Sequence, residues 1–301
     1  MSHFFKKVWL LLKETVQKFQ ENDPVVYAAA IAFFTVFSLP SMLIIIVKSL
    51  GSIISTDEIQ LNLANQIESL IGPASADEII AIIDARTLGD SNIFITAVGI
   101  VFLMFSATVI FAFLQKALNA IWGVKPKPKT GILKFAKDRV ISFSIIIVLS
   151  FLMLVSLALD AILSFARNYV RDLFSGFTVY IMDVANYFLS LVVIAFIFAL
   201  IFKFLPDAKI RWKDVTVGAF VTGLLFTLGK FLIGLLLSNT NITTTYGAAG
   251  SLAGILVWVF YSSIIVLIGA MFTRVYAANI GKEIRPKKHS VRVETRELEM
   301  D

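Results

Sequence analysis

The chain has 301 residues, of which 58% are hydrophobic and 16% are charged, whereas a soluble domain is about 45–50% apolar and about 25% charged. This balance excludes a water-soluble globule with a polar surface and excludes a disordered chain. The absence of cysteine excludes disulfides, thiol catalysis and cysteine-ligated metal sites. The net charge of +6 fits either nucleic acid or an anionic membrane surface, so its meaning depends on where the charges lie.

Residues 1–22 predict a cytoplasmic or interfacial amphipathic helix. Apolar residues from Phe4 to Phe19 recur at helical spacing, and the lysines lie largely elsewhere around the helix. In the interfacial interpretation Trp9 lies at the level of the lipid headgroups. A helix packed on the cytoplasmic end of a bundle is the alternative. The segment has neither the long apolar core nor the cleavage site of a secretory signal peptide.

Six stretches that follow are long enough to cross a bilayer. A transmembrane helix needs about 20 mostly apolar residues, and the gaps between charged residues supply them. The longest uncharged stretch is divided by a polar segment from Ser238 to Gly247. The predicted spans are residues 25–48, 92–115, 139–160, 180–203, 214–237 and 248–277. We therefore expect an all-α, polytopic membrane domain over residues 23–281.

The 27 Lys and Arg residues favour one side of this topology. They cluster in the N-terminal segment, after the second and fourth spans, and in a basic, mixed-charge tail over residues 282–301. The other side carries only Arg86, Arg167 and Arg171. Because positive residues mark the cytoplasmic side, both termini are predicted to be cytoplasmic. The charges are scattered and lack a nucleic-acid-binding motif, so membrane lipids and not nucleic acid are the expected partners.

Residues 51–91 form the one long connection on the outer side. Thr56 begins an amphipathic pattern that Gly72-Pro73 ends, and Ser75 with Glu78 forms a capping box before a second pattern. We expect two short helices that cover the outer mouth of the bundle. The acidic residues of this segment fit a cap that is exposed to water. A lid over the bundle, or a vestibule that attracts cations, is the more specific alternative.

Lys230 is the clearest exception to this distribution of Lys and Arg between the two sides of the membrane, because it lies inside the predicted fifth span. It is about seven residues, or roughly 10 Å, from the outer end, and its side chain tilts towards the cytoplasm. A lysine at such a depth costs at least ~2.5 kcal/mol, so it should face the bundle or a wet cavity and find a partner. A polar tie within the bundle and a bound anion, such as a lipid phosphate, are both open. The candidate substrate- or lipid-binding residues are Lys230, Asn119, Asn186 and Tyr246.

Small residues and one proline in the spans indicate close packing or a hinge. The pairs Gly250/Gly254 and Ala219/Gly223 have the spacing of small residues at helix–helix contacts, although a discontinuous helix is the alternative. A proline deep in the first span should kink it and free a carbonyl. The hinge or packing candidates are Pro40, Gly229, Gly247, Gly250 and Gly254.

No catalytic residue, metal site or cofactor is predicted, since the sequence lacks zinc-protease, nucleophile-elbow, Walker and dinucleotide motifs. We therefore do not expect an enzyme.

Several segments, in this order, resemble the YihY/BrkB family of bacterial inner-membrane proteins, formerly labelled ribonuclease BN. They are DPVVYAAAIAFFTVFSLPSML at 23–43, LQKALNAIW at 114–122, LPD at 205–207, WKD at 212–214 with Gly218-Ala219, LGK at 228–230, and YGAAGS at 246–251, continuing to Trp258 and Tyr261. The resemblance implies a six-span protein of the bacterial inner membrane. It also implies a transport role, for lipid, more than a ribonuclease activity.

The chain departs from the family pattern late in the sixth span. Where members often have Glu after Gly-Ala, this chain has Met271. A proton-coupled mechanism through a carboxylate at that position is therefore not expected. We expect transport or translocation of a lipid or another amphipathic anion, with a homo-oligomer open. A non-transporting, partner-binding scaffold is the alternative, and a membrane-tethered ribonuclease is least favoured.

Overall fold

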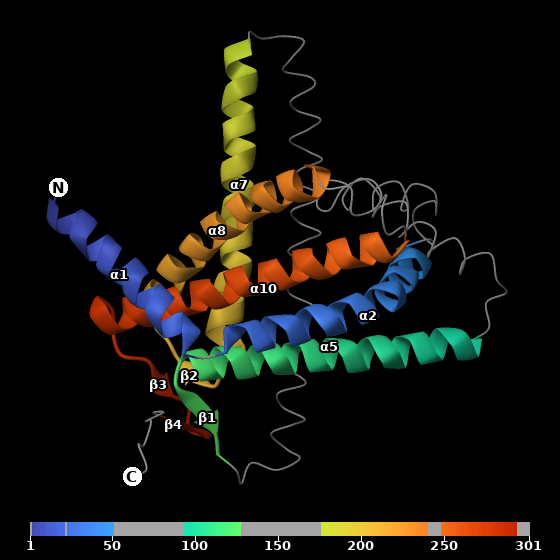
Figure 1. Cartoon of the computed structure of the whole chain (residues 1–301), viewed down its shortest axis with the longest axis horizontal. Coiled ribbons are helices and arrows are strands. Elements are labelled where there is room, and N and C mark those ends of the chain that lie inside the picture. The colour runs from blue at the N-terminus through green and yellow to red at the C-terminus, as the bar shows by residue number, and fades with distance from the viewer. Residues whose placement is uncertain (1, 22, 51–92, 128–175, 240–247, 294–301) are drawn as a thin grey trace. The chain divides into compact units, whose positions relative to one another are not determined.

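A computed structural model describes residues 2–21, 23–50, 93–127, 176–239 and 248–293 (Figure 1). Most of these residues are helical. The helices are α1 (Ser2–Gln20), α2 (Pro24–Leu50), α5 (Ile93–Ile121), α7 (Gly176–Phe204), α8 (Trp212–Asn239) and α10 (Ala248–Asn279). The strands are β1 (Val124–Pro126), β2 (Ala208–Lys209), β3 (Arg285–Pro286) and β4 (Ser290–Arg292).

The prediction of a mainly helical membrane protein is confirmed. Helices occupy the first, second, fourth, fifth and sixth predicted spans. In the part of the chain that the structure describes, three helical segments are long and apolar enough to cross a membrane: Tyr187–Phe204, Trp212–Ile233 and Leu252–Asn279. The predicted third span, 139–160, and the predicted outer cap, 51–91, lie outside the described residues.

The chain divides into two compact units. The first consists of Met1–Asn22, Gln115–Thr227 and Val266–Asp301, so it contains α1, α7, the strands and the adjoining ends of α5, α8 and α10. The second consists of Asp23–Leu114 and Leu228–Ile265, and contains α2 with the remaining parts of α5, α8 and α10. Three long helices thus contribute to both units.

In the first unit, α8 and α10 pack through two reciprocal glycine–threonine contacts. A Cβ on Gly218 would lie 1.8 Å from Thr273 Oγ1, and a Cβ on Gly269 would lie 1.9 Å from Thr222 Oγ1. Both threonines are completely buried. Each hydroxyl donates to the glycine carbonyl four residues earlier in its own helix, at 2.7 Å and 2.8 Å. The polar groups are therefore satisfied locally, and the two antiparallel helix backbones approach closely.

The predicted pair Ala219/Gly223 lies next to this contact, but Gly223 faces a different helix. Its Cβ position is 3.4 Å from Ala195 and Leu191 of α7, which is an ordinary van der Waals distance. The two glycines of α8 therefore differ sharply in what they tolerate. Gly218 has no room for a methyl group, whereas Gly223 has enough.

We predict that Gly218→Ala lowers the stability of the purified protein by about 2 kcal/mol, because the added methyl overlaps Thr273. Thermal unfolding in detergent measures the loss. Gly223→Ala is the matched control and should unfold close to the wild-type temperature. The double variant Gly218→Ala/Thr273→Gly should recover part of the loss. Equal effects of the two single variants would contradict the reciprocal packing.

The N-terminal helix α1 packs one face on the first unit. Leu11 and Thr15 are buried, and Glu14 Oε2 accepts a hydrogen bond from Asn279 Nδ2 at the end of α10, at 2.8 Å. A hydrogen bond from Lys18 holds the pKa of Glu14 below its usual value, and the bond from Asn279 acts in the same direction. The opposite face, with Trp9 and Val16, is exposed. Among the described residues, α1 is thus attached along one side.

In the second unit, α2 starts with Pro24 in its first turn, where proline suits a helix. It continues as one helix through Pro40, and it bends towards its C-terminal end in Figure 1. Before the proline, Thr35 Oγ1 donates to Ile31 O at 2.7 Å and Ser38 Oγ donates to Thr35 O at 2.8 Å. Such local bonds commonly accompany a bent membrane helix. Phe34 stacks on Phe113 of α5, with ring centroids 5.8 Å apart.

Candidate functional site

The connections after α5 and α7 and the segment after α10 fold together in the first unit. β1 pairs antiparallel with β4, with Val124 opposite Arg292, and β2 pairs antiparallel with β3, with Ala208 opposite Pro286. We call these four strands the strand platform (Figure 1). The sequence predicted residues 282–301 as a basic, mixed-charge tail. In the structure this segment contributes β3 and β4 to the platform.

Asp207, in the Leu-Pro-Asp motif, is the centre of a buried polar cluster under the platform. Its carboxylate accepts hydrogen bonds from Asn119 Nδ2 at 3.0 Å and contacts His289 Nε2 at 2.8 Å. Its backbone N–H donates to Asn119 Oδ1 at 2.8 Å, and its carbonyl accepts from Ser290 Oγ at 2.7 Å and Lys287 N at 2.9 Å. One aspartate thus joins α5, the α7–α8 connection and the C-terminal segment.

These contacts define the position of Asn119, one of the predicted binding residues. Asn119 is buried, and both ends of its amide bond to Asp207. The structure therefore places it in the support of the platform, in a different unit from Lys230.

A second buried acid, Asp214, joins the first turn of α8 to the residues after α10. Arg211 donates to both carboxylate oxygens, at 3.0 Å and 3.1 Å. The same carboxylate lies against Gly281, where a Cβ would come within 2.5 Å of Oδ1. An acid in the first turn of a helix is also favoured by the helix dipole. Asp214 therefore needs glycine at position 281.

The ends of α5 and α10 are joined by two further hydrogen bonds. Arg274 Nη1 donates to Ile121 O at 2.5 Å, and Trp122 Nε1 donates to Ala270 O at 3.3 Å. Cations are favoured at helix C-termini, where carbonyls lack partners. Gly123 then leaves the helix with a positive φ of 62°, which glycine adopts without strain.

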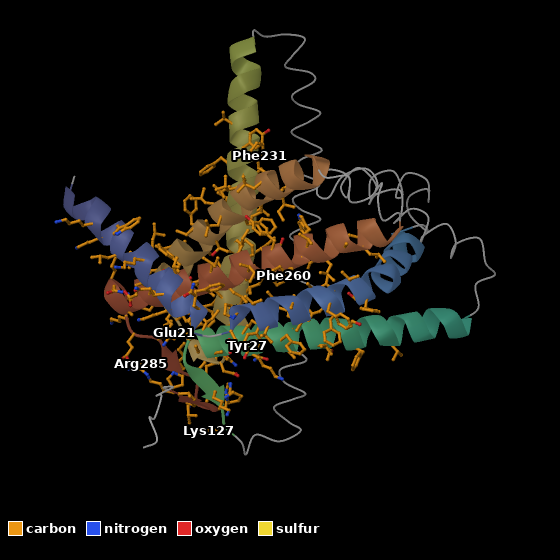
Figure 2. The ribbon with its side chains drawn as sticks, viewed as in Figure 1. Glu21, Tyr27, Lys127, Phe231, Phe260 and Arg285 are labelled. Atoms are coloured by element: carbon orange, nitrogen blue, oxygen red, sulfur yellow. The ribbon has the colours of Figure 1, made fainter. Side chains whose placement is uncertain are left out.

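The contacts of this cluster hold the platform together. Ser290 Oγ donates to backbone carbonyls and not to His289. Among the residues that the structure describes, no group of three His, Asp or Glu could hold a metal ion. The outer surface of the platform is basic: Lys127 and Arg285 are exposed there (Figure 2). Nearby, the Arg292 guanidinium lowers the pKa of Glu283, mainly by hydrogen bonding to it.

Replacing Asp207 tests whether the cluster holds the C-terminal segment. In Asp207→Ala, the buried Asn119 amide and His289 lose their partner, and we expect a loss of about 3 kcal/mol. Trypsin should then cleave within residues 282–292 faster than in the wild type. Glu283→Gln is the matched control, because its exposed pair with Arg292 contributes little. An unchanged cleavage rate in Asp207→Ala would refute this role.

Lys230, the other candidate site, is exposed on the C-terminal part of α8, within the segment Trp212–Ile233 that could span a membrane. No hydrogen bond or ion pair joins it to any residue that the structure describes. The preceding Gly229 is buried: its Cβ position is 2.6 Å from Ile265 Cδ1 and 2.7 Å from Tyr261 Cε1 of α10. Phe231, which follows Lys230, is also exposed (Figure 2). Gly229 thus packs on α10 while the lysine beside it faces outwards.

The other predicted residues are distributed as follows. Gly250 and Gly254 lie in the first turns of α10, and Gly254 is buried. Tyr246 and Gly247 lie outside the described residues, as does the side chain of Asn186 in α7. Met271, at the position where the family often has Glu, is fully buried in α10. An apolar side chain suits this position, since a carboxylate there would need a partner.

The predictions missed the roles of Asp207, Asp214 and His289. Two signals could have indicated them. Both acids lie in short motifs beside predicted helix ends, and His289 is one of only two histidines in the chain. Their partners, however, are about 70 to 90 positions away, and no local pattern identifies such partners.

Together, the apolar helices and the folded polar end define a polytopic helical membrane protein. The family model for virulence factor BrkB matches residues 15–294, so this chain belongs to that family. The chain is 23% identical to the UPF0761 membrane protein of Idiomarina loihiensis, covering 90% of this chain and 92% of that protein. It is 24% identical to a UPF0761 membrane protein of Acinetobacter baylyi, over 88% of this chain and 62% of that protein.

A third relative, a UPF0761 membrane protein of Bordetella petrii, is 26% identical over 88% of this chain and 56% of its own length. The chain therefore spans nearly the whole of one curated relative and about three-fifths of the other two. No solved structure matches the chain.

Proposed function

We propose that this protein transports or translocates an amphipathic anion across the inner membrane, with an anionic lipid as the substrate class, and that Lys230 binds the headgroup. The observation that carries the proposal is an exposed lysine, without a partner among the described residues, in a segment apolar enough to span a membrane. A phosphate group is a chemical partner that such a lysine can bind directly.

The position of Lys230 in its helix supports this assignment. Insertion scales give about 2.5–3.5 kcal/mol for a lysine at the centre of a span, and Lys230 lies three residues before the end of the segment Trp212–Ile233, within reach of a headgroup. Lys230 lies about 27 Å along α8 from Trp212 at 1.5 Å per residue, and its side chain tilts back towards the start of the helix, away from the outer surface. Because no carboxylate among the described residues pairs with it, its charge is open to a bound anion such as a headgroup phosphate.

The proposed orientation has both termini in the cytoplasm. The strand platform and the attachment of α1 to Asn279 gather the N-terminal helix, the ends of α5 and α7 and the C-terminal segment within one unit. These are the segments that carry most of the lysines and arginines. The positive-inside rule then assigns this end of the unit to the cytoplasm.

A partner-binding scaffold is the second candidate, and the basic surface of the platform favours it. Such a scaffold would use the platform and would not depend on Lys230. The two functions therefore differ in which residue is essential.

Replacement of Lys230 distinguishes them. We expect Lys230→Ala to reduce translocation of a fluorescent anionic lipid in proteoliposomes at least about tenfold, because a headgroup ion pair in an apolar setting is lost. Lys230→Arg should retain a large part of the activity. Lys213→Ala, an exposed lysine at the other end of α8, is the matched control and should behave as wild type.

Each variant also needs a thermal unfolding measurement. If Lys230→Ala translocates lipid normally, or loses activity only in proportion to a loss of folded protein, the proposed role of Lys230 is wrong.

A further inference from the structure

The helix α1 has two apolar faces, and the described residues of the first unit cover one of them. Leu11 and Thr15, four residues apart, are buried on the packed face. Trp9, Leu12 and Val16 follow at spacings of three and four residues, so they share another face of the helix. Trp9 is 68% exposed and Val16 is 61% exposed. We call Trp9, Leu12 and Val16 the open stripe.

Basic residues border the open stripe. Lys6 and Lys13 lie three and four residues from Trp9, so they adjoin it on the helix surface, and both are exposed. A tryptophan and two aliphatic residues with lysines along one edge are typical of helices that lie in a membrane interface. The lysines are complementary to anionic headgroups, whose attraction falls off within about a Debye length of the surface.

Contacts within the first unit connect α1 to an exposed aromatic cluster at the start of α8. Glu14 in the middle of α1 bonds Asn279 at the end of α10, and the residues just beyond, at Gly281, contact Asp214 in the first turn of α8. Two residues earlier, Trp212 is half-exposed. Its ring packs edge-on to Phe204 and lies 5.3 Å below Lys203 Nζ.

Exposed tryptophan beside lysine at the end of an apolar helix marks the boundary between hydrocarbon and headgroups. The hydrogen bond between Glu14 and Asn279, which holds α1, lies beside the contacts that lead to Trp212. From these observations we propose that α1 is a peripheral membrane-docking helix, whose open stripe inserts into an anionic lipid surface while Glu14 and Leu11 hold the helix to the unit. The proposal concerns a lipid surface, is independent of transport, and leaves Lys230 unused.

Site-directed spin labelling tests the proposal in the intact chain, which contains no native cysteine. Val16→Cys places a label on the open stripe, and Gln17→Cys places a matched label on an exposed polar position one residue away. Each variant is reconstituted in nanodiscs of phosphatidylcholine alone and of phosphatidylcholine with phosphatidylglycerol. Accessibility to oxygen and to a water-soluble nickel complex reports the depth of each label.

We expect the ratio of oxygen to nickel accessibility to be several-fold higher at position 16 than at position 17. The difference should grow with phosphatidylglycerol and shrink in the variant Lys6→Glu/Lys13→Glu. Equal ratios at the two positions in both nanodiscs would overturn the proposal. So would dipolar broadening at position 16 alone, because that result would show a second copy of the chain covering the stripe.

Discussion

The buried carboxylate of Asp207 is the interaction on which the strand platform and its surroundings depend. A buried acid is costly unless hydrogen-bond donors surround it, and here the donors come from parts of the chain far apart in sequence. Asn119 lies in the last turn of α5, and His289 and Ser290 belong to the C-terminal segment. The need to satisfy one acid therefore fixes where two connections and the chain after α10 must lie.

The helix contacts of the first unit follow a related rule. Thr222 and Thr273 carry hydroxyls into a completely buried contact, but each satisfies its hydroxyl within its own helix. The opposing glycines then let the backbones approach, so packing and not polarity joins α8 to α10. The contact between Asp214 and Gly281 has both features, because a buried acid lies against a position where only a glycine fits. Lys230 differs from all these groups, because nothing among the described residues satisfies its charge.

The fold could be predicted where its signal is local. Apolar runs between charged residues predicted the positions of α2, α5, α7, α8 and α10, and the periodicity of residues 1–22 predicted α1. The strand platform could not be predicted in this way, because strands of two or three residues have no recognisable period and pair across long sequence separations. The small-residue contact was predicted one position away from Gly218. One position turns the helix by about 100°, which is enough to face α7 instead of α10.

The candidate binding residues likewise differ in how much of their role the local sequence could predict. Lys230 was recognisable from sequence because a charge inside an apolar run conflicts with its surroundings. Asn119 was recognised as polar and well placed, but its partner, Asp207, is 88 positions away, and only the fold shows that its amide is engaged. The local sequence thus identified Lys230 and Asn119 as unusual residues. Only the three-dimensional contacts showed that Asn119 supports the fold, whereas Lys230 stays a candidate binding residue.

The proposed binding of an anionic headgroup by Lys230 can be observed in an electron cryo-microscopy structure of the full chain in nanodiscs containing an anionic phospholipid. We expect density for a headgroup phosphate within ion-pair distance of the Lys230 ammonium. A lysine that is instead paired with a protein carboxylate, with acyl chains but no headgroup beside it, would show that the proposal is wrong.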